Sequence, residues 1–129
     1  MKIIYLTRKQ IVQLHDYALS QDGGLDGIKE PGYLDLIAEK PYTTLFNEEQ
    51  YPGLFLKAAI YMEGLATAHA FNDANKRTAL FVMLTFMSIN GYSIDADADD
   101  LFEVTILVAT NRWNRTQLAR WIEEHARLS

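Results

Sequence analysis

The segment 69–79 gathers side chains that could handle a phosphate group. It reads His-Ala-Phe-Asn-Asp-Ala-Asn-Lys-Arg-Thr-Ala. A helix that begins within it would offer unpaired N–H groups and a positive dipole end, to which Lys76 and Arg77 would add two cations. Asp73 is a carboxylate that could hold Mg²⁺ together with phosphate oxygens and waters. His69 carries an imidazole, a side chain that could accept the proton of an attacking hydroxyl.

Each of these residues also has an ordinary structural interpretation. A lone histidine such as His69 is more often a capping or surface residue, and Asp73 could simply cap the helix that follows. Lys76 and Arg77 could form a solvated helix start, and Phe71 is most simply a core anchor. On physical grounds alone, a site at this loop is a weak hypothesis.

Helical periodicity and capping residues predict the elements that position the loop. Thr7 and Gln10 have the spacing of a capping box, and Asn114 with Gln117 repeats it. The acidic run 95–100 fits a helix N-terminus. We expect helices at about 7–20, 31–39, 52–69 and 76–90, a fifth after the acidic run and a sixth from Asn114.

The third and fourth of these helices are apolar on most sides, which predicts that they are buried and central. The loop 69–79 connects them. The fold class we expect is therefore all-α: a bundle of about six helices with two buried central helices. The length of 129 residues fits one domain, 1–129.

Residues with β-propensity cluster between Pro41 and the third helix. We expect a small β-hairpin or flap here. Its residues are Tyr42, Thr43, Thr44, Leu45 and Phe46. The alternative is a surface loop with some buried aromatic residues.

Composition excludes several classes of function. The net charge of −5 argues against direct nucleic-acid binding and against binding to an anionic membrane surface. The chain has no cysteine, which excludes disulfides and thiolate metal sites and suits a cytoplasmic location. The longest apolar run, 78–89, is too short to span a bilayer. The three histidines are not spaced as zinc ligands, and His15 is interpreted as a core-edge residue.

The loop resembles the motif of the Fic/Doc family, His-x-Phe-x-(Asp/Glu)-Gly-Asn-Gly-Arg-x-x-Arg. The matching residues are His69, Phe71, Asp73, Asn75 and Arg77. The segment 23–32 also resembles a loop of Doc-type proteins, and size and helical layout agree. The resemblance implies a Fic/Doc-like helical fold over essentially the whole chain.

The departures from the Fic pattern indicate the Doc branch of the family. Ala74 and Lys76 replace the two motif glycines, and Leu80 replaces the final arginine, which in Fic enzymes helps to fix the triphosphate for AMP transfer. The resemblance to Doc-type proteins implies a reversed nucleotide and transfer of the γ-phosphate of ATP. It also implies a toxin that acts on a threonine of elongation factor Tu and arrests translation.

The same resemblance implies a role for each loop residue. His69 would be the general base, Asp73 the Mg²⁺ ligand, and Asn75, Lys76 and Arg77 the residues that bind phosphate. An inhibitory segment of the form (Ser/Thr)-x-x-x-Glu-(Gly/Asn) is absent from the sequence. Inhibition in trans by a Phd-like antitoxin is therefore implied. Fic/Doc proteins have a flap in the stretch that corresponds to 42–46, so the resemblance also implies that this stretch lies beside the His69 loop and holds a target chain by main-chain hydrogen bonds.

Two other functions remain open from the sequence. One is a Fic-type nucleotidyl transferase that attaches AMP to a protein hydroxyl, which Lys76 and Leu80 disfavour. The other is a non-catalytic helical module that only binds a partner, against which stands the complete Doc-type motif.

Overall fold

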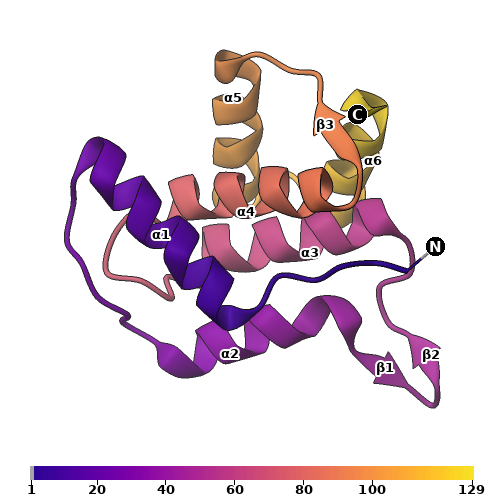
Figure 1. Cartoon of the computed structure of the whole chain (residues 1–129), viewed down its shortest axis with the longest axis horizontal. Helices are drawn as coiled ribbons and strands as arrows, with labels where there is room; N and C mark the ends of the chain where they lie inside the picture. Colours follow the sequence, from indigo (N-terminus) through magenta and orange to yellow (C-terminus); the bar gives the residue numbers. More distant parts are fainter. Residues whose placement is uncertain (1) are drawn as a thin grey trace.

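The computed structural model describes residues 2–129, which form mainly α-helices (Figure 1). The helices are α1 (Arg8–Asp22), α2 (Pro31–Glu39), α3 (Leu54–Thr67), α4 (Asn75–Ile89), α5 (Ala98–Ala109) and α6 (Arg115–His125), with a 3₁₀ helix η1 (Lys40–Tyr42) after α2. Two antiparallel strand pairs complete it: β1 (Thr44–Leu45) with β2 (Glu48–Glu49), and β3 (Tyr92–Ile94) with β4 (Ala126–Leu128). The prediction of an all-α fold with a small β-hairpin is confirmed.

Capping side chains fix where the predicted helices begin. Thr7 accepts the Gln10 N–H at 3.2 Å, and the Gln10 side chain accepts the Thr7 N–H at 2.8 Å. Asn114 and Gln117 form the same reciprocal pair, at 2.9 Å in each direction. Asp97, from the acidic run, caps α5 by accepting the N–H of Asp100 at 2.8 Å. The caps read from the sequence therefore start α1, α5 and α6 where they were expected.

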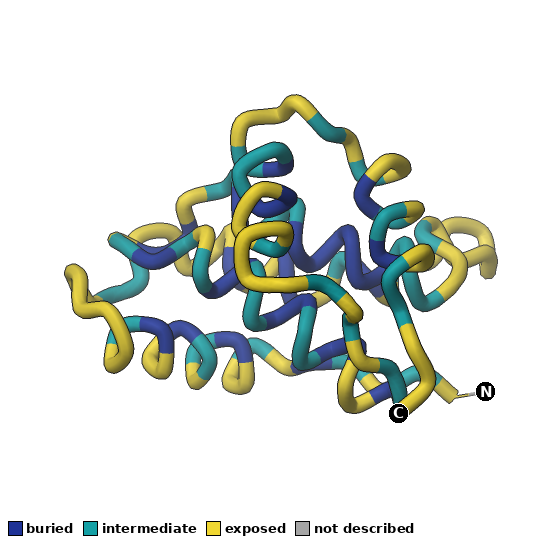
Figure 2. Tube along the Cα trace, turned by 90° about the horizontal axis from the view of Figure 1, so that it is seen from above, coloured by how far each residue is buried: buried dark blue, intermediate teal, exposed yellow. Residues whose placement is uncertain are grey.

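The core forms around α3, which contacts α4, α5, α6 and α2. Six consecutive residues of α3, 57–62, are buried, so this helix is covered on all sides. Along α4 the buried residues recur in pairs four apart, at 78–79, 82–83 and 86–87, and the residues between them are mostly half-buried. Figure 2 shows the buried residues gathered toward the middle of the molecule. The two helices that flank the loop, α3 and α4, therefore each contain more buried residues than any of the other helices.

The C-terminal strand is an element that sequence reasoning missed. β4 pairs with β3 in the register Tyr92–Leu128, Ser93–Arg127 and Ile94–Ala126. The extended form of 92–94 was predicted. Its partner strand lies more than thirty residues further along the chain, so local sequence patterns could not predict the pairing.

The hairpin β1–β2 turns at Phe46 and Asn47, whose φ values of 51° and 65° are those of a two-residue turn between antiparallel strands. Lys57, a buried residue in the first turn of α3, contacts the chain where the hairpin begins and ends. Its Nζ donates to Pro41 O at 3.0 Å and lies 3.1 Å from a carboxylate oxygen of Glu49. The hairpin is therefore fixed to the N-terminal end of α3.

The expectation that residues 42–46 lie beside the His69 loop is wrong. The loop follows the C-terminal end of α3, and the fourteen residues of this helix span about 21 Å. Figure 1 shows the hairpin and the loop at opposite ends of α3. A small hairpin was predicted correctly, but of the residues 42–46 only Thr44–Leu45 form a strand, and the partner strand, Glu48–Glu49, lies beyond them. The long helix that follows separates the hairpin from the loop.

Within residues 2–129, no helix is both long and apolar enough to cross a membrane.

Candidate active site

The loop between α3 and α4 holds two residues in left-handed backbone conformations. His69, two residues past the end of α3, has φ 50°, and Ala74 has φ 64° and ψ 24°. A non-glycine residue in this region costs about 1–2 kcal/mol, so surrounding contacts must hold it there. The loop is therefore a built feature and not a relaxed connection.

Ala74 opens the N-terminus of α4 to a ligand. It is the N-cap of the helix and supplies no capping side chain. The N–H groups of the next three residues, 75–77, have no intrahelical partner, because Thr78 N–H is the first to bond back, to Ala74 O at 2.9 Å. A left-handed residue followed by helical ones turns successive N–H groups toward one point, which makes an anion-binding concavity.

Asp73 points its carboxylate to the edge of this concavity. Oδ1 accepts the N–H of Ala74 at 2.8 Å, and Oδ2 accepts the N–H of Leu25 at 3.3 Å. Those two hydrogen bonds, with the nearby charge of Arg77, lower the pKa of Asp73 below its ordinary value. Neither bond is to a second- or third-position N–H of α4, so Asp73 is not an ordinary helix cap. Each oxygen keeps lone pairs, and an ionised carboxylate in this position suits a hard cation such as Mg²⁺.

The side-chain amide of Asn75 closes the loop. Its Oδ1 accepts the N–H of Phe71 and its Nδ2 donates to Phe71 O, both at 3.0 Å. This paired contact spans four residues and fixes the loop's width. Asn75 can therefore meet a phosphate mainly through its backbone N–H and one remaining amide hydrogen.

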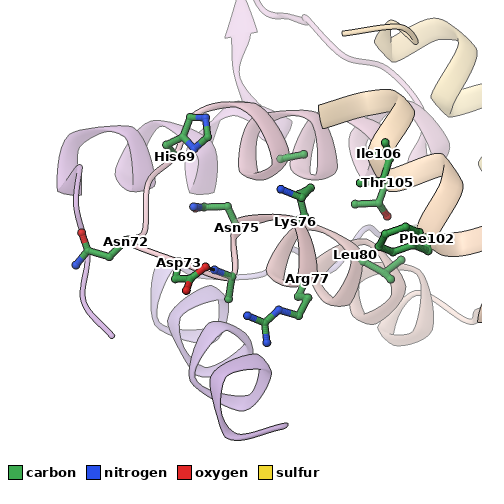
Figure 3. A pocket seen from close by; sticks show the side chains of 12 residues that line it. His69, Asn72, Asp73, Asn75, Lys76, Arg77, Leu80, Phe102, Thr105 and Ile106 are labelled. Carbon is green, nitrogen blue, oxygen red and sulfur yellow. Dashed lines mark hydrogen bonds between the residues drawn. The ribbon is translucent and has the colours of Figure 1, made fainter. Parts of the chain in front are cut away.

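The two cations at the start of α4 differ in their surroundings. Arg77 donates to the carbonyls of Ala18 and Gly23 at 3.1 and 3.2 Å and lies 3.3 Å from Asp22, so its guanidinium is bound to the end of α1. Figure 3 shows that guanidinium directed away from Lys76. Lys76 is exposed and forms no ion pair within residues 2–129. Lys76 is the cation free to meet a ligand.

His15 is a supporting residue that sequence reasoning placed only at the core edge. It is 1% exposed, its ring stacks on that of Phe71 at 3.8 Å, and its Nε2 lies 3.0 Å from Asp73 O. A hydrogen bond from Nε2–H to that carbonyl holds the chain at Asp73 from behind. The sequence did contain a signal for this role: His15 lies in the buried stripe of α1 with Ile11 and Ala18, and a fully buried imidazole needs a polar partner.

The segment 25–30 borders the loop. Ile28 bridges Phe71, and the N–H groups of Lys29 and Glu30 both donate to Ala70 O, at 2.9 and 3.0 Å. The resemblance of 23–32 to a Doc-type loop is thus matched by a position beside the motif.

Two glycines let this segment approach closely. A Cβ on Gly24 would lie 2.7 Å from the Oδ2 of Asp73, and one on Gly27 would lie 2.7 Å from the Nδ2 of Asn72. Both glycines also have positive φ, 129° and 113°. Their lack of a side chain is required by the contact as well as by the backbone.

A cavity of about 420 Å³ joins the loop to α5. Its size is within the usual range for a small-molecule site. Its lining residues are Ala66, His69, Asn72, Asp73, Ala74, Asn75, Lys76, Arg77, Leu80, Phe102, Thr105 and Ile106 (Figure 3). The structure therefore brings five predicted site residues to one hollow, and leaves the hairpin residues 42–46 outside it.

His69 is exposed in this hollow, and its imidazole forms no hydrogen bond to any other described residue. A ring nitrogen of His69 is therefore free to accept a proton from a group that enters the cavity. A separate group of potential ligands, His15, Asp16 and Asp26, places its ligand atoms within 4.8 Å of one another and does not include Asp73. Asp73 faces the cavity, whereas the ring nitrogens of His15 already contact Asp73 O and Asp16.

Comparison with known proteins identifies the family. The sequence model of the Fic/DOC family matches residues 5–87. The chain is similar to a protein of Escherichia phage P1 named "Protein kinase doc", with 34% identity over 89% of this chain and 90% of that protein. It is also similar to "Toxin Doc" of Mycolicibacterium smegmatis, with 48% identity over 36% of this chain and 35% of that protein. The chain described here belongs to the Fic/DOC family.

Proposed function

We propose that this protein is a Doc-like toxin that transfers the γ-phosphate of ATP to a threonine hydroxyl of a protein target. One observation carries the proposal: a single cavity joins an exposed histidine, an ionised carboxylate and the open N-terminus of α4. Phosphoryl transfer needs mainly positioning and charge neutralisation, which such a set supplies. The relative named "Protein kinase doc" supports the same reaction class.

His69 acts in this proposal as the general base. Its imidazole is exposed to the cavity and has no protein partner among residues 2–129, so a nitrogen can take the hydroxyl proton. As the new O–P bond forms, the bond between the γ-phosphorus and the β–γ bridging oxygen breaks and ADP leaves.

Asp73, Lys76 and the first N–H groups of α4 hold the phosphates. Mg²⁺, bound by Asp73 and phosphate oxygens, would neutralise charge on the transferred group. Arg77 supports the site through its charge near Asp73 and through its bonds to α1. Asn75 keeps the concavity at its width through Phe71. In this proposal Asn75 and Arg77 therefore act mainly by supporting the loop, whereas the sequence predicted that both contact phosphate directly.

Leu80 favours γ-phosphate transfer over AMP transfer. It lines the cavity where the Fic motif has its final arginine, and a leucine cannot fix the far end of a triphosphate. The terminal phosphate is then the one that the polar end of the cavity can hold beside His69.

The proposed target is elongation factor Tu, so that modification arrests translation in the cytoplasm. The proposed inhibitor is a Phd-like antitoxin acting in trans. The relative named "Toxin Doc" supports the role of a toxin. We assign the target-binding role to Leu25–Glu30 in place of the hairpin, because this segment borders the loop through the Ile28–Phe71 bridge.

Expression in bacteria tests the proposal. Wild-type protein without a partner should arrest growth, and His69→Ala should relieve the arrest, since loss of a positioned base costs roughly 10²–10⁴ in rate. His125→Ala is the matched control, because His125 lies at the end of α6 outside the cavity and should remain toxic. Equal toxicity of His69→Ala and wild type would remove His69 from the mechanism.

A further inference from the structure

The cavity beside the loop has two chemically different ends. His69, Asp73 and Lys76 line one end, and Leu80, Phe102 and Ile106 line the other (Figure 3). In Figure 3, Lys76 lies between His69 and the apolar group. Nothing in the proposed roles of the loop residues accounts for the apolar end.

The apolar end is within reach of a nucleotide held at the start of α4. Leu80 follows Lys76 by one helical turn, which is about 6 Å along the axis. Across the cavity, α5 presents Phe102, which is 66% exposed, and Ile106, which is half-buried. An exposed aromatic ring at the wall of a cavity offers a flat face to a ligand.

We propose that the apolar end is a nucleobase subsite in which the base stacks on Phe102 and contacts Leu80 and Ile106. The inference rests on the proposed phosphate transfer. When the terminal phosphate lies beside His69 and the phosphates follow the N-terminus of α4, the rest of the nucleotide extends past Lys76. The side chains it meets there are apolar, and they suit a base and not further phosphates.

This subsite binds a base without reading its polar edge. The only hydroxyl at this end belongs to Thr105, and it donates to Leu101 O within α5 at 2.8 Å. The remaining side chains, Ala66, Leu80, Phe102 and Ile106, carry no hydrogen-bonding group. Stacking tolerates any base, because every base has a π-face. We expect ATP and GTP to bind within about tenfold of each other, whereas a site that hydrogen-bonds its ligand can discriminate by about 10⁴–10⁵-fold.

Calorimetry with three probes tests the subsite: ATP, GTP and inorganic tripolyphosphate, each with Mg²⁺. Replacing an aromatic residue that stacks on a base by alanine weakens binding by about 5- to 150-fold. Phe102→Ala should weaken ATP and GTP by that factor and leave tripolyphosphate unchanged, because tripolyphosphate has no base. Phe102→Tyr keeps the ring and should retain ATP affinity. Leu36→Ala, which removes a side chain 64% exposed on α2 outside the cavity, is the matched control.

The outcomes separate this inference from the proposed function. Unchanged ATP binding by Phe102→Ala, or an equal loss for tripolyphosphate, would overturn the subsite while leaving the phosphate site intact. Preference for ATP over GTP by more than about 10²-fold would overturn readout by stacking alone. Wild-type protein that binds neither ATP nor tripolyphosphate would refute both the proposed function and the subsite.

Discussion

Replacing Gly24 by alanine should damage the site through Asp73 without unfolding the protein. The added Cβ would lie 2.7 Å from the Oδ2 of Asp73, and ordinary contact begins at 3.4 Å, so the carboxylate must retreat by about 0.7 Å. This carboxylate is the end of a flexible side chain, so it can move at little cost in stability. Its retreat lengthens the 3.3 Å hydrogen bond from Leu25 and takes an oxygen away from its place at the cavity.

Gly23→Ala is the matched control for the backbone. Gly23 and Gly24 both have positive φ, 74° and 129°, so an alanine at either position carries strain of about 1–3 kcal/mol. A Cβ on Gly23, however, meets nothing within 4 Å. Both variants therefore place an alanine at positive φ and differ in what the added Cβ meets, which on Gly24 is Asp73 and also Leu19 Cδ2 at 3.1 Å.

The assay is phosphate transfer as a function of Mg²⁺ concentration, with thermal unfolding measured alongside. A misplacement of about 1 Å can cost roughly 10²-fold in rate, so Gly24→Ala should lose about 10- to 100-fold at low Mg²⁺ and recover part of it at high Mg²⁺. Gly23→Ala should stay near wild type in rate. Equal losses in both variants, or full activity of Gly24→Ala at low Mg²⁺, would refute the argument that the position of Asp73 controls activity.

Three further predictions concern pH and the supporting residues. The pKa of Asp73 is lower in the folded than in the unfolded chain, so its charge stabilises the fold above about pH 4, and this stabilisation is lost on further acidification. In Asp73→Asn the free energy of unfolding should therefore depend less on pH below about pH 4. Burial raises the pKa of Tyr61, so its neutral form stabilises the fold below about pH 10 and stability falls as pH rises further. Tyr61→Phe should cost about 1–3 kcal/mol in urea unfolding at neutral pH, because Leu6 N–H and C=O lose their partner, and should unfold less steeply above pH 10. His15→Leu should lower stability by about 1–3 kcal/mol and raise the Mg²⁺ concentration needed for half-maximal transfer; an unchanged Mg²⁺ requirement would leave His15 a purely structural residue.

Local patterns in the sequence were enough to place the helices. The capping pairs at Thr7 and Asn114 and the periodic apolar residues fixed α1 and α6, because caps and amphipathic spacing act within a few residues. The loop between two apolar helices followed from the same patterns, and of its matched motif residues His69, Asp73, Asn75 and Arg77 line one cavity while Phe71 lies in the core.

Long-range placements were beyond local patterns. The pairing of β3 with β4, the bridge between Ile28 and Phe71, and the contact of buried His15 with the loop join segments far apart in the chain. The hairpin illustrates the same limit. A hairpin near residues 42–46 was predicted, whereas its place at the far end of α3 depends on the helix that separates it from His69.

The side-chain partners of the motif residues also needed coordinates. Asn75 and Arg77 matched the motif as residues that bind phosphate, yet their side chains bond Phe71 and the end of α1. Residue type alone does not tell whether a polar side chain faces a ligand or holds the loop that does. Lys76 forms no ion pair within residues 2–129, and its phosphate-binding role stays a prediction.

The central claim is that the terminal phosphate of ATP, and not AMP, is transferred to protein. Incubation of the purified protein and a bacterial extract with ATP labelled on either the γ- or the α-phosphate tests it, with His69→Ala as the negative control. The γ-label should enter a target protein whose intact mass rises by one phosphate, and the α-label should not enter. Incorporation of the α-label together with an AMP adduct would contradict the account, and would instead support the nucleotidyl transferase that Leu80 argues against.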